Sequence, residues 1–92
     1  MPQIFKIGQY LVYFWANESN PLEPMHVHIA MGTPVANATK VWITQAGGCV
    51  LCNNNSQIPS HILRNLMEII AARSTEVVDK WEHFFGEATY YC

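Results

Sequence analysis

The sequence contains few charged residues. Only 13% of its 92 residues are Asp, Glu, Lys or Arg, and five basic residues stand against seven acidic ones. Neither half of the chain has a basic stripe of the kind that displaces phosphate counterions. We therefore do not expect the monomer to bind nucleic acid nonspecifically, although a catalytic contact with RNA stays open.

Long hydrophobic runs and targeting signals are also missing. The apolar run Tyr10–Ala16 is far too short to span a bilayer, and the first residues do not resemble a secretory signal. The three cysteines, an odd number, do not make a disulfide framework. We expect a cytoplasmic protein that does not contact a membrane and keeps its thiols reduced, with disulfide formation as the alternative.

Apolar residues, by contrast, are abundant. Half of the chain is hydrophobic and 12% of it is aromatic. Its length fits a single domain, residues 1–92, which can bury only a modest fraction of its surface. Because so small a domain cannot easily hide that many aromatic side chains, we expect some of them to be shared with a second copy in a homodimer.

The first part of the chain, about residues 4–52, has the pattern of β-strands. Turn-forming residues separate the strands, including Gly8-Gln9 and the loop Asn17–Pro24 with its two prolines. The second segment is apolar on both of its faces, so it should be central or lie under an interface. The segments are Ile4–Ile7, Tyr10–Trp15, His26–Met31, Lys40–Thr44 and Cys49–Cys52.

The later part, about residues 59–86, has the period of two helices. Ile62, Leu66 and Ile69 form one apolar stripe, and Val77 and Trp81 belong to the other. Strands followed by helices predict an α+β fold. We expect a curled antiparallel sheet of about four strands, with two C-terminal helices packed on one face.

His26 and His28 are the strongest candidates for a binding site. Side chains alternate along a strand, so both imidazoles should lie on the same face, roughly 6–7 Å apart at the backbone. Two such rings can ligate one metal ion, or act as acid and base on one substrate. The structural alternative is that they bond to backbone groups. No catalytic residue is assigned.

Cys49 and Cys52 form a C-x-x-C motif, which suggests zinc or a redox dithiol. Positions three apart on a strand face opposite ways, so the thiols converge only if the backbone bends. We therefore expect them to be buried small apolar residues, with no metal or cofactor. The alternative is a four-ligand zinc site made of His26, His28, Cys49 and Cys52.

The motifs around the histidines resemble those of domain-of-unknown-function family 4160, a family of small bacterial proteins. The shared features are a Met1-Pro2 start, an aromatic strand, Asn20-Pro21 leading to Pro24-x-His26-x-His28, and Trp81-Glu82 in the last helix. The insertion of Leu22-Glu23 and the cysteine-rich stretch depart from the pattern. The resemblance implies no established activity. Members are often encoded beside another small protein, in an arrangement similar to toxin–antitoxin operons.

Three functions stay open at this stage. The first is a protein-interaction module that pairs with itself and with a second small protein, as in a toxin–antitoxin-like pair; the aromatic content favours it. The second is a His-dependent RNase or other hydrolase that uses His26 and His28. The third is a zinc-binding protein. We favour the first, and whether the chain is an enzyme stays open.

Overall fold

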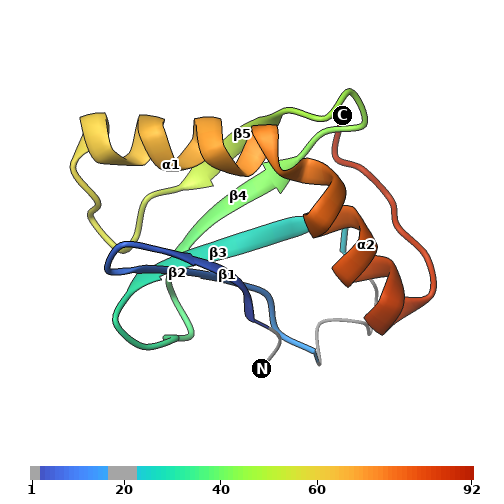
Figure 1. The fold of residues 1–92 in the computed structure, drawn as a ribbon, viewed down its shortest axis with the longest axis horizontal. Helices are drawn as coiled ribbons and strands as arrows, with labels where there is room; N and C mark the ends of the chain where they lie inside the picture. Colours follow the sequence, from blue (N-terminus) through green and yellow to red (C-terminus); the bar gives the residue numbers. More distant parts are fainter. Residues whose placement is uncertain (1–2, 17–22) are drawn as a thin grey trace.

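The computed structural model describes residues 3–16 and 23–92, which form a sheet covered on one face by two helices (Figure 1). The predicted loop Asn17–Pro24 lies outside the described residues except for its last two, and so do Met1-Pro2 and Asn20-Pro21. The strands are β1 (Gln3–Ile7), β2 (Tyr10–Tyr13), β3 (His26–Met31), β4 (Thr39–Ile43) and β5 (Cys49–Asn53). The helices are α1 (Ser60–Ala72) and α2 (Ser74–Phe85).

The sheet is a meander in which each strand pairs with its neighbour in sequence. The spatial order is β1-β2-β3-β4-β5, and all four pairings are antiparallel. The prediction of an α+β fold with two C-terminal helices on one face is confirmed. The expected number of about four strands was slightly low, because all five predicted segments form strands.

Strand β3 is central and is buried on both faces. Val27 and Ile29 join the main core under the helices, whereas His26 and His28 alternate with them on the other face, where the His26 ring reaches Trp81 of α2, at 5.3 Å. Its neighbours are β2 and β4, so its backbone groups are paired on both sides. The central strand therefore carries apolar packing on one face and the two imidazoles on the other.

The main core lies between the sheet and the helices. Each helix contributes one apolar stripe, with Leu66 and Ile70 buried from α1 and Trp81 from α2. Helix α2 ends at Gly86, whose φ of 78° places it in the left-handed region that favours glycine, and its N–H donates to the carbonyl of Glu82 at 2.8 Å. After Gly86 the chain leaves the helix and runs toward the end of the sheet where β3 begins.

The face of β2 that points away from the helices is covered by its own chain. Leu11 and Tyr13 pack with Ala30 and Ala38. The Tyr13 hydroxyl donates to the carbonyl of Val35 at 2.9 Å and accepts from the Val35 N–H at 3.2 Å, which holds the loop between β3 and β4 over the sheet. The apolar character of β2 is thus explained within one chain, without a second copy.

The segment after α2, residues 87–92, runs back along the sheet (Figure 1). The Met25 N–H donates to the carbonyl of Thr89 at 2.7 Å, and the Gln45 N–H donates to the carbonyl of Cys92 at 3.0 Å. The ring of Tyr91 stacks on that of Trp42, with centroids 5.0 Å apart and an interplanar angle of 6°. This segment forms no strand but fastens α2 to the ends of β3 and β4. In the part of the chain that the structure describes, no helix is long and apolar enough to cross a membrane.

We predict that Trp81→Ala lowers the free energy of unfolding by about 3–5 kcal/mol, because it empties the centre of an aromatic cluster. The Trp81 side chain is 0% exposed, and its ring lies 4.5 Å from that of Phe85 and 5.1 Å from that of Phe14. Denaturant titration followed by circular dichroism measures the change.

The matched control is Phe84→Ala, which removes a ring from the same helix that is 48% exposed. Its loss should stay below about 1.5 kcal/mol, since the half-exposed ring makes only edge contacts, with Phe14 and with His83. Equal losses for the two variants would contradict this account of the core.

Candidate functional site

The two histidine rings lie side by side, as the alternation along β3 predicts. The ring centroids of His26 and His28 are 5.1 Å apart, and the planes are nearly perpendicular at 87°. Across the strands, His26 stands opposite Trp42, and His28 stands opposite Lys40 on one side and Tyr13 on the other. The pair is therefore framed by aromatic residues and one lysine.

His26 is fully enclosed. Its side chain is 0% exposed, and its ring lies 5.3 Å from that of Trp81 and 5.8 Å from that of Trp42. Its Nδ1 is 3.0 Å from the carbonyl oxygen of Pro24. Because a carbonyl only accepts, Nδ1 must carry the proton, and in the neutral ring the lone pair is on Nε2. The bond fixes both the tautomer and the orientation of the ring.

His28 is nearly as buried, at 7% exposed, and its ring centroid lies 5.7 Å from that of Tyr13. Lys40, its cross-strand neighbour, forms an ion pair with Glu23, with Nζ 3.0 Å from Oε1, and the same ammonium lies 4.3 Å from the centroid of the Trp42 ring. These groups are partly exposed, so each contact contributes only a few tenths of a kcal/mol to about 1 kcal/mol. They define the rim on one side of the pair.

The cysteines of the C-x-x-C motif do not join the histidines. Cys49 faces α1, where its thiol donates to the carbonyl of Met67 at 3.3 Å, whereas the imidazoles are on the opposite face of the sheet. Cys52 is exposed. Within residues 3–16 and 23–92, no three His, Cys, Asp or Glu side chains are arranged to hold a metal ion. The alternative zinc set of His26, His28, Cys49 and Cys52 is therefore not assembled.

The remaining histidines lie on the helix surfaces. His61 is in the first turn of α1, and His83 is near the end of α2, where its ring packs against Phe84. Both side chains are exposed, as is Glu82 beside them. Nothing brings these residues to the pair on β3.

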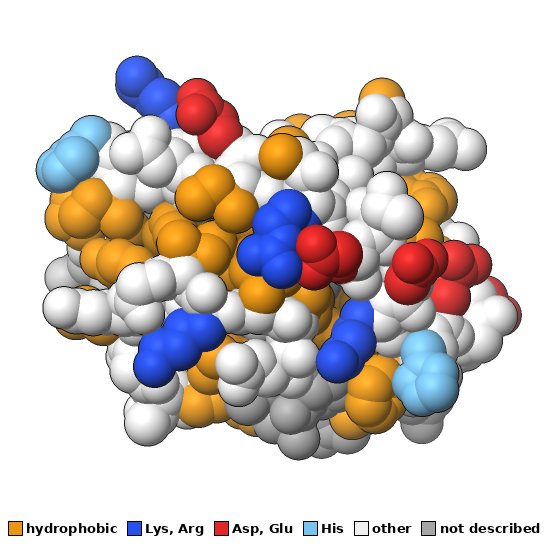
Figure 2. All heavy atoms as spheres, in the orientation of Figure 1, with side chains coloured by type: hydrophobic (Ala, Val, Ile, Leu, Met, Phe, Trp, Pro, Cys, Tyr) orange, Lys and Arg blue, Asp and Glu red, His pale blue; other side chains and the backbone are white. Residues whose placement is uncertain are grey.

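A groove that the sequence pattern did not reveal lies on the helix side of the molecule. It has a volume of about 390 Å³ and is formed by the turn between β1 and β2 on one side and by α1 on the other. Figure 2 shows apolar side chains gathered between these two elements. Its lining residues are Ile7, Gly8, Gln9, Tyr10, Ile62, Asn65, Leu66 and Ile69.

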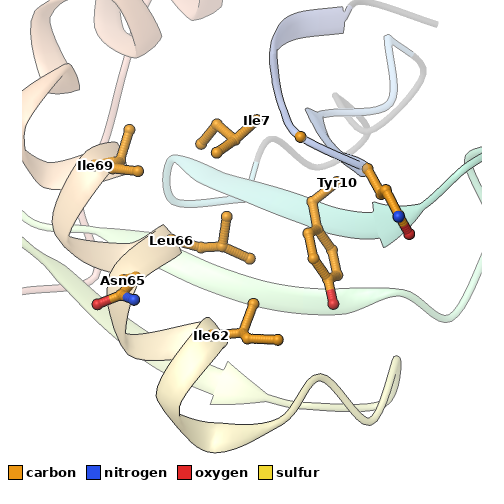
Figure 3. A pocket seen from close by; sticks show the side chains of 8 residues that line it. Ile7, Tyr10, Ile62, Asn65, Leu66 and Ile69 are labelled. Atoms are coloured by element: carbon orange, nitrogen blue, oxygen red, sulfur yellow. The ribbon is translucent and has the colours of Figure 1, made fainter.

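The groove is apolar at its base and polar only at its margin. Ile7 and Tyr10 of the hairpin face Ile62 and Leu66 of α1 across the opening (Figure 3). None of the lining residues is charged. The helical stripe at 62, 66 and 69 was predicted, but only the position of the hairpin shows that part of it stays uncovered. Its size and chemistry suit apolar side chains of a ligand or a partner protein.

We predict that the three thiols react at two different rates with a thiol reagent at pH 8. Burial raises the pKa of the Cys49 thiol, so less of it is thiolate at a given pH, whereas Cys52 and Cys92 are exposed. Cys49 should react at least about tenfold more slowly, because the thiolate is the reactive species. The absorbance of the released chromophore measures the rates. Cys49→Ala should remove only the slow phase; removal of a fast phase would contradict this assignment.

Comparison with known proteins identifies the family. No curated protein and no solved structure matches the chain. Residues 10–82 match the family described as Domain of unknown function (DUF4160), and this segment includes strands β2 to β5, α1 and most of α2. The sequence resemblance is thereby confirmed over more than half of the chain: this protein belongs to the DUF4160 family.

Proposed function

We propose that this chain is a cytoplasmic protein-interaction module that pairs with itself and with a second small protein, as in a toxin–antitoxin-like pair. The observation that carries the proposal is the uncharged groove between the β1–β2 turn and α1. A chain of 92 residues that leaves a 390 Å³ apolar groove open has a surface that a partner can fill. By contrast, the histidine pair is enclosed.

The groove favours apolar side chains from an amphipathic segment of the second protein. Four aliphatic residues and the Tyr10 ring provide the contact surface, while Gln9 and Asn65 supply amide groups at the margin. Among the described residues, neither amide side chain forms a hydrogen bond. A partner that presents leucine-like side chains beside a polar backbone would satisfy both kinds of surface.

The partner to be tested is a small protein encoded beside the gene for this chain. We choose it because members of the family are often encoded beside another small protein, in an arrangement similar to toxin–antitoxin operons. We expect the two purified proteins to form a complex, and Ile62→Lys to weaken it at least about 30-fold (~2 kcal/mol), since the ammonium would enter an apolar contact. Isothermal titration calorimetry measures the affinity.

Val35→Lys is the matched control, because it adds the same charge at a residue that is 50% exposed on the loop between β3 and β4. It should bind as the natural chain does. Absence of any complex between the natural proteins would refute the proposed pairing. Equal weakening by both variants would show that the groove is not the contact.

A second candidate function, hydrolysis by the histidine pair, is favoured by one observation. The rings of His26 and His28 are adjacent, and the bond to Pro24 leaves His26 with its basic nitrogen at Nε2. Burial of both side chains weighs against it, because a substrate would need the covering segments to move.

The two functions are separated by the variant His26→Ala/His28→Ala, with His61→Ala/His83→Ala as the control at exposed positions. We expect both variants to bind the neighbouring protein, because no histidine lines the groove. Loss of an RNA-cleaving activity in the first variant alone, with its circular dichroism unchanged, would instead establish the hydrolase. If the alanine pair fails to fold, His28→Asn tests the less enclosed ring by itself.

A further inference from the structure

The two edges of the sheet differ in their chemistry. The edge strand β1 carries Lys6, which is exposed, and has an irregularity in register between Gln3 and Phe5. A lysine and a bulge are common devices that prevent an edge from pairing with another chain. The opposite edge strand, β5, has the sequence Cys-Val-Leu-Cys-Asn and contains no charged residue. Of the two edge strands, β5 is therefore the one without a charged side chain that would oppose pairing.

The backbone groups on the outer edge of β5 can be assigned from the pairing with β4. The Ile43 N–H donates to Met25 on the β3 side, and the Thr44 N–H donates to the carbonyl of Gly48 on the β5 side. Because these directions alternate along a strand, Val50 pairs with Trp42, and the N–H and C=O groups of Cys49 and Leu51 point outward. No segment within residues 3–16 and 23–92 forms backbone hydrogen bonds with that outer edge.

Apolar side chains stand on both faces of this edge. Val50 is 40% exposed on the face of Trp42, which also carries the stacked ring of Tyr91. Leu51 is 40% exposed on the other face, beside α1. An added strand would cover both side chains while satisfying the outward-pointing backbone groups. A partner strand that is itself uncharged and apolar on both faces fits this edge best.

We propose that β5 pairs antiparallel with β5 of a second copy of this chain, about a two-fold axis beside Val50. This inference gives the self-association proposed above its contact surface, and it rests on that proposal. The strand is its own complement, because it brings no like charges together and supplies apolar residues to both faces. The result is a continuous ten-stranded sheet across two chains.

The register follows from the irregularity in the pairing of β4 with β5. The register shifts between Lys40 and Val41, which leaves Cys52 as an extra residue and confines regular geometry to Cys49–Leu51. With Val50 on the axis, Cys49 and Leu51 exchange hydrogen bonds with Leu51 and Cys49 of the second copy. The two Val50 side chains then face each other and extend the row that contains His26 and Trp42.

Helix α1 is compatible with this arrangement. It lies along β5 (Figure 1) and contacts it through Met67. A two-fold axis at β5 sets the α1 helices of the two copies antiparallel. Arg64 and Glu68 are exposed on α1, one of each sign, so antiparallel helices bring opposite charges toward each other. The exposed charges of α1 therefore do not oppose pairing of β5 with β5 of a second copy.

The test measures molar mass by light scattering after size exclusion, with the full chain, across the micromolar range. We expect a mass approaching twice the 10.5 kDa of one chain. Val50→Lys should weaken the dimer at least about tenfold, because like charges directly opposite destabilise a strand pair. Val35→Lys, with the same added charge away from the edge, should keep it. Circular dichroism verifies that both variants fold.

A cross-link tests the register. In the Cys52→Ser/Cys92→Ser background, Val50→Cys should form a disulfide-linked dimer on mild oxidation, since opposed non-hydrogen-bonded residues have Cα atoms about 4.5 Å apart. Val35→Cys in that background should not. A natural chain that stays monomeric, or a Val50→Lys dimer of unchanged affinity, would overturn the inference. Binding of the neighbouring protein is measured separately by calorimetry. A chain that binds this protein but does not dimerise would refute the β5 contact and leave the proposed groove contact standing.

Discussion

The alternation of side chains along β3 is the constraint on which the rest of the structure depends. Val27 and Ile29 face the helices and help to close the core, so His26 and His28 must occupy the opposite face. A one-residue slip of this strand would place both imidazoles in the apolar core and both aliphatic side chains on the face that Tyr13 and Trp42 share. The pairing of β3 with strands on both sides fixes the register against such a slip.

The enclosure of His26 follows from the position of α2 and of the residues before β3. Trp81 of α2 lies over the start of β3 and contacts the imidazole, while the Pro24 carbonyl holds Nδ1. A buried imidazole with a fixed tautomer adds specificity to a packed core, because only one ring orientation satisfies its hydrogen bond. The groove and the edge of β5, by contrast, are open and uncharged. We therefore propose that the open surfaces, rather than the polar pair, contact other molecules.

Much of the fold could be predicted from local patterns. The two-residue period at 26–31 located β3 and the face of its histidines, and the stripes containing Leu66 and Trp81 located the helices. What escaped prediction depends on contacts between distant residues. Tyr13 is covered by the loop that contains Val35, 22 residues away in sequence. The groove exists because the β1–β2 turn and α1 do not close over the residues between them. The orientation of Cys49 toward Met67 likewise follows from sheet register and not from the C-x-x-C spacing.

The fastening of residues 87–92 has a consequence for the order in which the molecule assembles and opens. The carbonyls of Thr89 and Cys92 meet amide groups of Met25 and Gln45, which take their places only after β3 and β4 have paired. The segment can therefore dock fully only after those strands have paired. We expect it to open locally before the paired strands do, because apart from the partly buried Ala88 and Tyr90 it is held by two backbone bonds and by the stack of Tyr91, which is 60% exposed.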